Sequence, residues 1–579
     1  MDKKLISLLK FQRAMAATGL ERPLILFIVS AGASVWLAYD RIPALISFGR
    51  ILLAAGLFFL VVNLPRRLQA YAAWIFLCLT AAFSVFWALR NNYAAGPDEF
   101  DWITSIGVRL NATFPLSAGP ALHPNVAAGT MLAGLPFGIV LGWGAYKQAQ
   151  TGLVILASGT SALILAGLLL ADSRGVWVGL GATVLLAGLA AVQRRWFSVR
   201  RARRRFWGVA LALALLLAAA LVWSGLLETL AGQIPDPGGL MRSRTALWRE
   251  GAGLARDYFF TGAGLASFSL NHAAYAILTH VPYTANSHNA FLEIWIEQGI
   301  LGAAALLWGL VVTLGWARQA LSRRAIPRLA WAGLAGLWAA GVHGVVEVAF
   351  YGQPTLPVIG VVLGFAALAA PNPADRPAKL PLASRRAALL IGAAVLASTA
   401  LVFHRPIRAG WYVNLGALEQ SRIELSQFDP ENFDHPALEE IRARSDLQHA
   451  QSLFRKALSI QPDNLTALRR LSLIALAQGE YPAALAWMET AWNAGWRETT
   501  TRLIYGDALV AAGQPDLAAN VLQGISWAAG RLAGQGWARY WNQGDAARAV
   551  YAWQAALELD PQNRDAAVWL ANANSHGKP

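Results

Sequence analysis

The sequence predicts an all-α protein, in which a polytopic bundle of transmembrane helices is followed by an α-solenoid. The chain has 579 residues and is 56% hydrophobic but only 14% charged, whereas soluble proteins carry about a quarter charged residues. Apolar runs near 20 residues, the length that crosses a bilayer, recur as far as residue 403. From about residue 406 the chain becomes polar, rich in Ala and Leu, and helical in period.

About eleven apolar runs are candidate spans, and the first and tenth of them are short for a bilayer. The runs are 24–39, 44–63, 69–89, 125–146, 152–171, 175–193, 206–223, 290–317, 329–350, 356–370 and 387–403.

Positive charge predicts the orientation of this bundle, because Lys and Arg are retained on the cytoplasmic side. Basic residues gather in the N-terminal tail and after the second, sixth, eighth and tenth runs, which all fall on one side if the runs alternate. The connection after the sixth run holds seven arginines and no acid. We therefore expect the N-terminus inside and the C-terminus outside an inner membrane, and we attribute the net charge of +15 to topology and not to nucleic-acid binding.

These patterns predict the domain boundaries. The expected parts are a cytoplasmic tail at 1–23, a polytopic membrane domain at 24–403 with long external loops at 90–124 and 224–288, a helical linker at 404–445 and a repeat domain at 446–579.

Cys78 is the only cysteine, so the chain forms no internal disulfide and no cysteine metal site is expected. The basic, charge-interrupted N-terminus is not typical of a removed signal peptide. Asp98, Glu99 and Asp101 could bind a divalent metal, although a solvated acidic loop is the interpretation we favour. The sequence also lacks a phosphate-binding loop, a dinucleotide fingerprint and an H-E-x-x-H zinc motif.

The polar C-terminal region contains a repeat. Gly479, Gly513 and Gly544 stand at predicted helix–helix turns and are 34 and 31 residues apart, and A-L-S-I-Q-P-D-N at 457–464 returns as A-L-E-L-D-P-Q-N at 556–563. This period is typical of tetratricopeptide repeats, whose paired helices stack into a solenoid. The expected role is to bind a protein partner, and the alternative is a packing or stabilising appendage.

Arginines dominate a predicted helix at 242–257. Arg242, Arg249 and Arg256 are each seven residues apart and share one stripe, which suits a solvated or headgroup-facing surface. Arg244 faces nearly the opposite way, among apolar residues. Burying the arginine charge there costs free energy unless the guanidinium pairs with an anion. We expect Arg244 to point into a site, with a salt bridge to a carboxylate as the alternative.

Two further residues suit chemistry on phosphates and hydroxyls at the outer boundary. Arg174, in D-S-R-G, is either an interfacial anchor or a phosphate clamp, because its planar fork fits phosphate oxygens. His288 opens the eighth run after the capping types Asn286 and Ser287. The positive end of a helix favours a neutral imidazole, which can accept a proton as a general base; a structural hydrogen bond is the alternative.

The ninth run carries an ionisable pair, His343 and Glu347, four residues apart and expected on one helix face. Ionisable residues inside a membrane are functional candidates, although a mutual structural pair is equally consistent. His123, Pro124 and Asn125 are interpreted as a loop terminus.

At these residues the sequence resembles the O-antigen ligase and polymerase superfamily of bacterial membrane glycosyltransferases. The similar segments are D-S-R-G-x-W-x-G at Asp172–Gly179, R-x-x-x-W at Arg244–Trp248, T-G-A-G-L-A-S-F at Thr261–Phe268 and S-H-N-A-F-L-E-I-W-I-E-Q-G-I-L-G at Ser287–Gly302. The last is the most specific. The chain departs from the family where Phe259-Phe260-Thr261 replaces a segment with proline.

The resemblance implies a metal-independent, inverting transfer of a glycan from undecaprenyl diphosphate to an acceptor hydroxyl on the periplasmic side, without a cofactor. The acceptor could be a lipid core sugar, a glycan chain or a protein. Arg174 and Arg244 would hold the donor diphosphate and His288 would activate the acceptor. The expected supporting residues are Arg242, Asn289, Glu293, His343 and Glu347. The alternative is a non-enzymatic lipid-glycan transporter or an assembly scaffold.

Overall fold

The computed structural model describes residues 18–93, 101–114, 122–196, 240–277, 284–322, 326–371, 382–429 and 437–576. Throughout these ranges the chain forms helices and turns without a strand, as the sequence predicts. The chain divides into two compact units. The first unit comprises Met1–Ala252, Gly264–Phe268 and Asn286–Lys379, and the second comprises Gly253–Ala263, Ser269–Ala285 and Leu380–Pro579.

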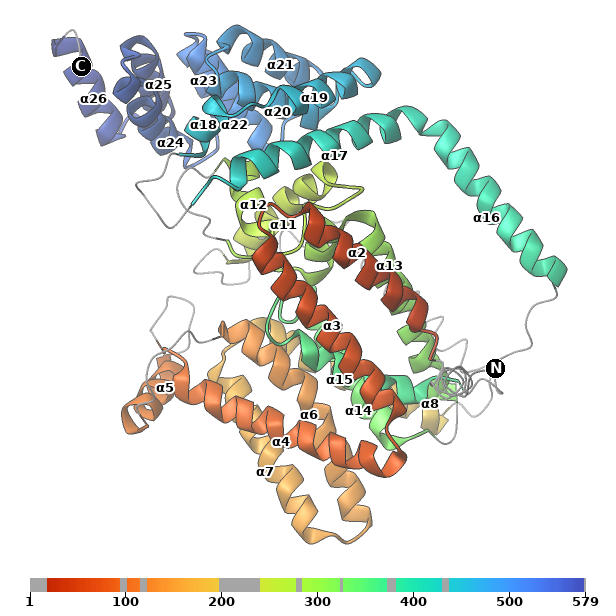
Figure 1. The fold of residues 1–579 in the computed structure, drawn as a ribbon. Coiled ribbons are helices and arrows are strands. Elements are labelled where there is room, and N and C mark those ends of the chain that lie inside the picture. The colour runs from red at the N-terminus through yellow and green to blue at the C-terminus, as the bar shows by residue number, and fades with distance from the viewer. Residues whose placement is uncertain are drawn as a thin grey trace. The chain divides into compact units, whose positions relative to one another are not determined.

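The first unit is a bundle of mostly apolar helices (Figure 1). Its helices are α2 (Glu21–Leu37), α3 (Arg41–Asn63), α4 (Arg66–Arg90), α5 (Asp101–Thr113), α6 (Pro124–Lys147), α7 (Thr151–Leu170), α8 (Arg174–Trp196), the start of α11 (Leu240–Asp257), α13 (Ala290–Ser322), α14 (Arg328–His343) and α15 (Leu356–Ala366). A 3₁₀ turn at Ala367–Ala369 follows α15. Within α13, Gly299 has non-helical angles, φ 63° and ψ −161°.

Six of the described helices are long and apolar enough to cross a membrane: α3, α4, α6, α7, α8 and α13. Several expose large apolar side chains, such as Ile75 and Leu79 on α4 and Leu307 and Val311 on α13. Exposed apolar surface of this extent fits lipid contact. These helices support a multi-pass membrane protein.

The predicted count of eleven spans is only partly reproduced. Helices α2, α14 and α15 have 17, 16 and 11 residues, at or below the practical limit of about 17 for a span. The run expected at 329–350 is helical only to His343. The run at 206–223 lies outside the described residues. The orientation of the bundle stays a prediction.

Small residues allow the helices of the first unit to pack closely. A Cβ added to Gly360 of α15 would lie 2.0 Å from the carbonyl oxygen of Ala54 on α3, and one added to Gly333 of α14 would lie 2.2 Å from the nitrogen of Ala366. Small interface residues are typical of membrane helices, because helix association in lipid depends on close packing. In the core that α4, α6 and α15 share, Phe76, Phe137 and Phe365 meet edge to face.

Both long loops that we expected contain helices. The first carries α5, and Asp98 and Glu99 of the acidic cluster lie outside the described residues. The second carries α11, whose bounds agree with the predicted helix at 242–257, and α12 (Phe268–Ala276). Parts of this second loop belong to each of the two units.

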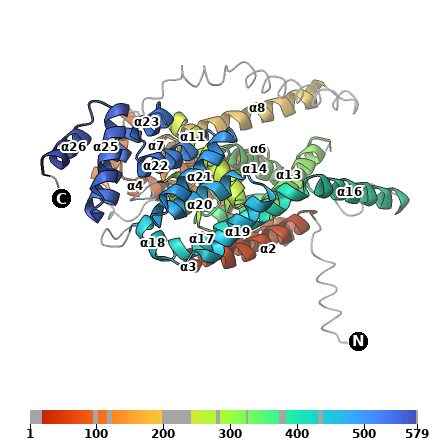
Figure 2. The same ribbon diagram turned by 90° about the horizontal axis from the view of Figure 1, so that it is seen from above.

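The C-terminal part of the second unit begins with two helices of 21 and 22 residues and continues as an array of shorter ones (Figure 2). They are α16 (Leu382–Val402), α17 (His404–Leu425), α18 (Leu438–Arg444), α19 (Gln448–Ile460), α20 (Leu465–Ala477), α21 (Tyr481–Asn493), α22 (Thr499–Ala511), α23 (Pro515–Leu522), α24 (Ala528–Gln535), α25 (Ala546–Leu559) and α26 (Arg564–His576). Short π and 3₁₀ turns at Gly536–Tyr540 and Trp541–Gln543 join α24 to α25.

Helix pairs recur along this array. Helices α19, α21, α23 and α25 begin at 448, 481, 515 and 546, so the repeat is 31 to 34 residues. The three predicted turn glycines lie between helices with φ of 78° to 82°. Both copies of the repeated octapeptide end on an asparagine whose side chain caps the next helix: Asn464 accepts from the Ala467 N–H at 3.1 Å and Asn563 from that of Ala566 at 3.0 Å. Assignment to the tetratricopeptide family stays a prediction.

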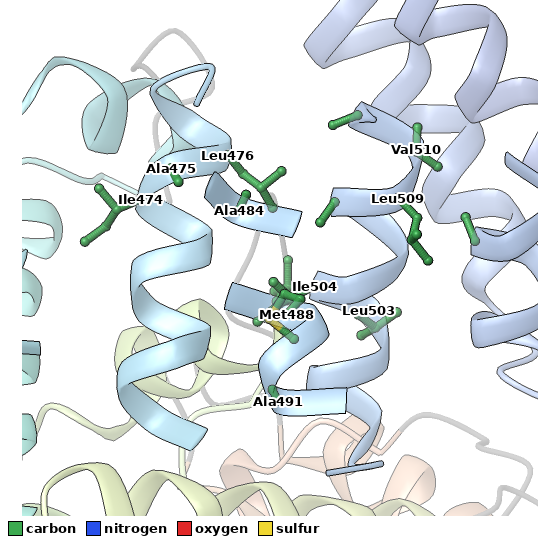
Figure 3. Packing of buried hydrophobic residues seen from close by; sticks show 14 of the residues in the cluster. Ile474, Ala475, Leu476, Ala484, Met488, Ala491, Leu503, Ile504, Leu509 and Val510 are labelled. Atoms are coloured by element: carbon green, nitrogen blue, oxygen red, sulfur yellow. The ribbon is translucent and has the colours of Figure 1, made fainter. Parts of the chain in front are cut away.

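Buried aliphatic side chains join successive helices of the array. Figure 3 shows Met488 of α21 and Ile504 of α22 within this cluster, and both are fully buried. The segment 404–445, which we expected as a linker, contains α17, and α17 packs along α19. The C-terminal part of the second unit begins at Leu380 and therefore includes α16, the helix that corresponds to the eleventh predicted span.

Gly360→Ala tests the close packing of α3 on α15. Its Cβ would overlap backbone that cannot move aside, and overpacking of this kind costs about 1–3 kcal/mol. We expect a lower melting temperature and a lower yield of monodisperse protein in detergent. Gly56→Ala on α3 is the control, because an added Cβ there meets nothing within 4 Å. Equal behaviour of the two variants would contradict the close approach.

Candidate functional site

The turn that carries His288 is fixed by local hydrogen bonds. The Asn286 side chain accepts from the His288 N–H at 3.0 Å, and the Asn289 side chain accepts from the N–H groups of Phe291 and Leu292, each at 3.0 Å. Asn289 is therefore the cap of α13, whereas we had assigned capping to Asn286 and Ser287. His288 itself has φ 49°, a left-handed conformation that is uncommon outside glycine and is found at functional sites.

Glu293 holds the other side of this turn. Its carboxylate Oε2 accepts from the Ser287 N–H at 2.7 Å, and the Ser287 hydroxyl donates to the Asn289 carbonyl at 3.0 Å. The Ala290 N–H donates to the Gly344 carbonyl at 2.8 Å, which ties the start of α13 to the end of α14. Ser287 and Glu293 are both buried. The backbone around His288 is therefore held on both sides.

Glu347 is the centre of the candidate site. Its Oε1 lies 3.0 Å from Nδ1 of His288 and accepts from the Val348 N–H at 3.0 Å, and its Oε2 accepts from the Asn125 amide at 2.6 Å. A guanidinium nitrogen of Arg244 lies 3.9 Å from Oε2. The Glu347 side chain is only 2% exposed, while that of His288 is 29% exposed. One buried carboxylate thus gathers residues from α6, α11 and the turn before α13.

The surroundings of Glu347 favour its charged form. The residue lies in the connection after α14, outside the six candidate spans. Burial acts to raise its pKa, but the hydrogen bonds from His288, Val348 and Asn125 outweigh burial and lower the pKa of Glu347 to about 2. The residue is therefore a carboxylate at neutral pH, and it can accept a hydrogen bond from Nδ1–H of His288. That hydrogen bond leaves the lone pair on Nε2.

Arg244 points toward this carboxylate, as we expected of an arginine on the apolar side of its helix. Its side chain is 19% exposed. Arg249, on the predicted solvated stripe, is exposed, and Arg256 on the same stripe is exposed and pairs with Glu498 at 2.9 Å. The side chain of Arg242 lies outside the described residues. The structure therefore shows the alternative interpretation, an arginine near a carboxylate, and a role of Arg244 in a functional site stays a prediction.

Arg174 begins α8 and is exposed. The next residue, Gly175, packs on His343, because a Cβ added there would lie 3.0 Å from the imidazole Nδ1. Nε2 of His343 in turn lies 3.1 Å from the carbonyl of Asn125, whose amide contacts Glu347. The start of α8 is thus connected to the carboxylate through His343 and Asn125.

The predicted pairing of His343 with Glu347 on one helix face is wrong. Helix α14 ends at His343, so Glu347 is not on the next turn of that helix. His343 is fully buried beside Asn125 and Gly175, and Glu347 bonds His288 and Asn125. The residues we had interpreted as a loop terminus, His123 and Asn125, lie in the site. His123 interacts electrostatically with Glu347, His288 and Arg244. The available signal was two polar residues, His123 and Asn125, on either side of a proline directly before an apolar run.

The glycine-containing segment Thr261–Phe268, which follows α11, is hydrogen-bonded to α13. The Gly264 N–H donates to the Glu297 carbonyl at 3.1 Å, and the Glu297 side chain accepts from the N–H groups of Ala266, Ser267 and Phe268. Gly264 has φ 104°, and an added Cβ would lie 2.4 Å from Cα of Ala38. Only glycine fits this position, because both the backbone angle and the space exclude a side chain.

A family model described as O-antigen ligase matches residues 159–307 of the chain. This range contains Arg174, Arg244 and His288, whereas Asn125 and Glu347 lie outside it. Among curated proteins and solved structures, none is detectably similar to the chain. Together with the six apolar helices, the match supports a membrane protein with an O-antigen-ligase-type role in glycan transfer.

The low pKa of Glu347 predicts a pH dependence of stability. The folded-state pKa of about 2 lies below the value of about 4.3 for an unfolded glutamate. The stabilisation is therefore fully present above about pH 5, and it is lost as the pH falls through 4.3 toward 2. We expect wild type to melt above Glu347→Gln at neutral pH, and the difference to shrink between about pH 5 and pH 3.

Thermal unfolding of the purified protein in detergent, followed by tryptophan fluorescence, measures this difference. Glu480→Gln is the control, because Glu480 is exposed, and it should melt with wild type throughout. A difference between wild type and Glu347→Gln that stays constant over the whole window would show that folding does not lower the pKa of Glu347.

Proposed function

We propose that the protein is a cell-envelope glycosyltransferase that moves a glycan from undecaprenyl diphosphate to an acceptor hydroxyl. The observation that carries the proposal is the pair of His288 and Glu347, 3.0 Å apart, with Arg244 beside the same carboxylate. The match to the O-antigen ligase family over Arg174, Arg244 and His288 supports it.

In the proposed reaction His288 is the general base. Glu347 holds its Nδ1–H, so Nε2 takes the proton of the acceptor hydroxyl as that oxygen attacks the anomeric carbon. The bond from this carbon to the diphosphate oxygen breaks, and the electron pair leaves with undecaprenyl diphosphate. Attack from the face opposite the leaving group inverts the anomeric centre. Glu347 also stabilises the imidazolium that forms, as a carboxylate does in a catalytic triad.

The arginines are proposed to stabilise the leaving group. The charge on the diphosphate grows as the glycosidic bond breaks, and a fixed guanidinium stabilises charge in a water-poor site more strongly than in water. Arg244 and His288 both lie close to the Glu347 carboxylate, with a guanidinium nitrogen at 3.9 Å and Nδ1 at 3.0 Å from its oxygens. Arg174 is proposed as the second cation from the start of α8, where the N–H groups of the helix also favour anions. The guanidinium charge, constant at any pH, serves in place of a metal ion in this proposal.

The positive-inside pattern supports an external, periplasmic location for this site and for the second unit. A large external array of helices suits a large or proteinaceous acceptor, or a protein partner. The acceptor hydroxyl could belong to a lipid core sugar, a growing glycan chain or a protein, and His288 would serve the same role in each.

Transfer of glycan from a lipid-diphosphate donor in membranes tests the proposal. Loss of a general base lowers rates by roughly 10²–10⁴-fold, so His288→Ala should be nearly inactive. Loss of a charge-stabilising donor costs about 10²–10³-fold, so Arg244→Ala should also fail. Arg249→Ala on the same helix is the matched control, because Arg249 is exposed and faces elsewhere, and it should retain activity. Chelators should leave wild-type transfer unchanged.

Normal transfer by both His288→Ala and Arg244→Ala, at wild-type expression, would exclude this site. A complete lack of transfer by wild type, together with specific binding of the lipid-linked glycan, would instead favour the alternative of a transporter or an assembly scaffold.

A further inference from the structure

The segment between Arg244 and His288 is shared between the two units. Within it, Gly253–Ala263 and Ser269–Ala285 belong to the second unit, while Gly264–Phe268 and the residues from Asn286 onward belong to the first. Helix α11 therefore begins in the first unit, which contains Arg244, and ends in the second at Asp257. Whatever holds Asp257 within the second unit also holds one end of the helix that carries Arg244.

Inside the second unit, Asp257 is bound by a buried arginine. Nε and Nη2 of Arg470 on α20 donate to its Oδ2 at 3.1 and 3.0 Å, and the Thr466 hydroxyl donates to its Oδ1 at 2.6 Å. The two side chains of the pair are 2% and 13% exposed. Both of these guanidinium nitrogens thus donate to one carboxylate oxygen, in a charge-assisted and largely desolvated pair that is stronger than a neutral hydrogen bond. Removing one partner leaves the other charge buried and unpaired.

The residues after Asp257 are held by two helices of the second unit, α17 and α20. The fully buried Tyr258 accepts from Arg470 at 3.2 Å and donates to Asn271 at 2.9 Å. The Asn414 side chain on α17 accepts from the N–H groups of Phe260 and Thr261, at 2.9 and 3.2 Å. Asn414 is also fully buried. Two N–H groups of this loop thus obtain their hydrogen bonds from α17 of the same unit.

We propose that Arg470 positions Arg244 on the donor diphosphate by fixing the C-terminal end of α11, the helix that carries both Arg244 and Asp257. This inference rests on the proposed function, because it assigns Arg244 to the donor. Arg470 is a positioning residue and touches no substrate.

The test compares steady-state transfer by full-length Arg470→Ala with wild type. A loosened α11 should lower kcat/KM for the lipid-diphosphate donor on the order of tenfold to a hundredfold, the range expected when a binding group shifts by about 1 Å. The KM for the acceptor should not change, because His288 is fixed by Asn286, Asn289, Glu293 and Glu347 within the first unit. Asp257→Ala should reproduce the pattern.

Arg531→Ala is the matched control. Arg531 forms an equally buried pair with Asp507 at 2.6 Å within the same unit, with side chains 8% and 2% exposed, and neither residue belongs to the segment 253–285. It should lose comparable thermal stability but keep the donor kinetics of wild type. If Arg470→Ala and Arg531→Ala show the same change, or if Arg470→Ala lowers only the active fraction with both KM values unchanged, the inference is wrong.

Hydrogen exchange separates this inference from the function on which it rests. Amides of α11 from Arg244 to Ala252 should exchange faster in Arg470→Ala than in wild type, and at the wild-type rate in Arg531→Ala. This measurement needs no activity. Faster exchange without any wild-type transfer would overturn the proposed function alone, whereas unchanged exchange would overturn the positioning role of Arg470.

Discussion

The candidate site depends on one constraint: a carboxylate buried as deeply as that of Glu347 must be satisfied by several partners at once. A charge removed from water costs several kcal/mol unless charges and hydrogen bonds replace the lost solvent. Glu347 meets this requirement with a backbone N–H, an asparagine amide and an imidazole, with a guanidinium nearby. Those partners come from distant parts of the sequence, so folding the first unit and assembling the site are the same event.

The position of the His288 imidazole explains why the surrounding turn has several side-chain to backbone hydrogen bonds. An imidazole acts as a base only if its second nitrogen reaches the substrate, and the left-handed backbone of His288 is one means of directing it. That conformation is sustained by Asn286, Asn289 and Glu293, each of which binds a neighbouring backbone N–H. The local strain is therefore offset by hydrogen bonds that a simple helix start would not require.

Sequence reasoning reached the helical class, the bounds of α11 and the turn glycines of the array, because composition and periodicity determine these features locally. The roles of Arg244 and His288 were implied by the family resemblance, and they stay predictions. Sequence reasoning failed for the side-chain partners that are determined by contacts between distant parts of the sequence. Nothing near residue 347 in the sequence shows that its partner is His288 and not His343, because that depends on where α14 ends. Asn125 was missed for the same reason: its amide has a role only once α6 lies beside the connection after α14. The joining of the loop after α11 to α17 and α20 also depends on a pairing across about 210 residues, as between Asp257 and Arg470.

The break at Gly299 changes what the length of α13 means. Its 33 residues would make a straight rod of roughly 50 Å, far longer than the roughly 30 Å of hydrocarbon in a bilayer. The residues after Gly299 alone measure about 35 Å, which matches that thickness with a modest tilt. The part before it, with the buried acids Glu293 and Glu297, is then free to lie at the water boundary. Helix α13 thus has two parts: an apolar part long enough to cross a membrane, and a polar part whose Glu293 binds the turn that carries His288.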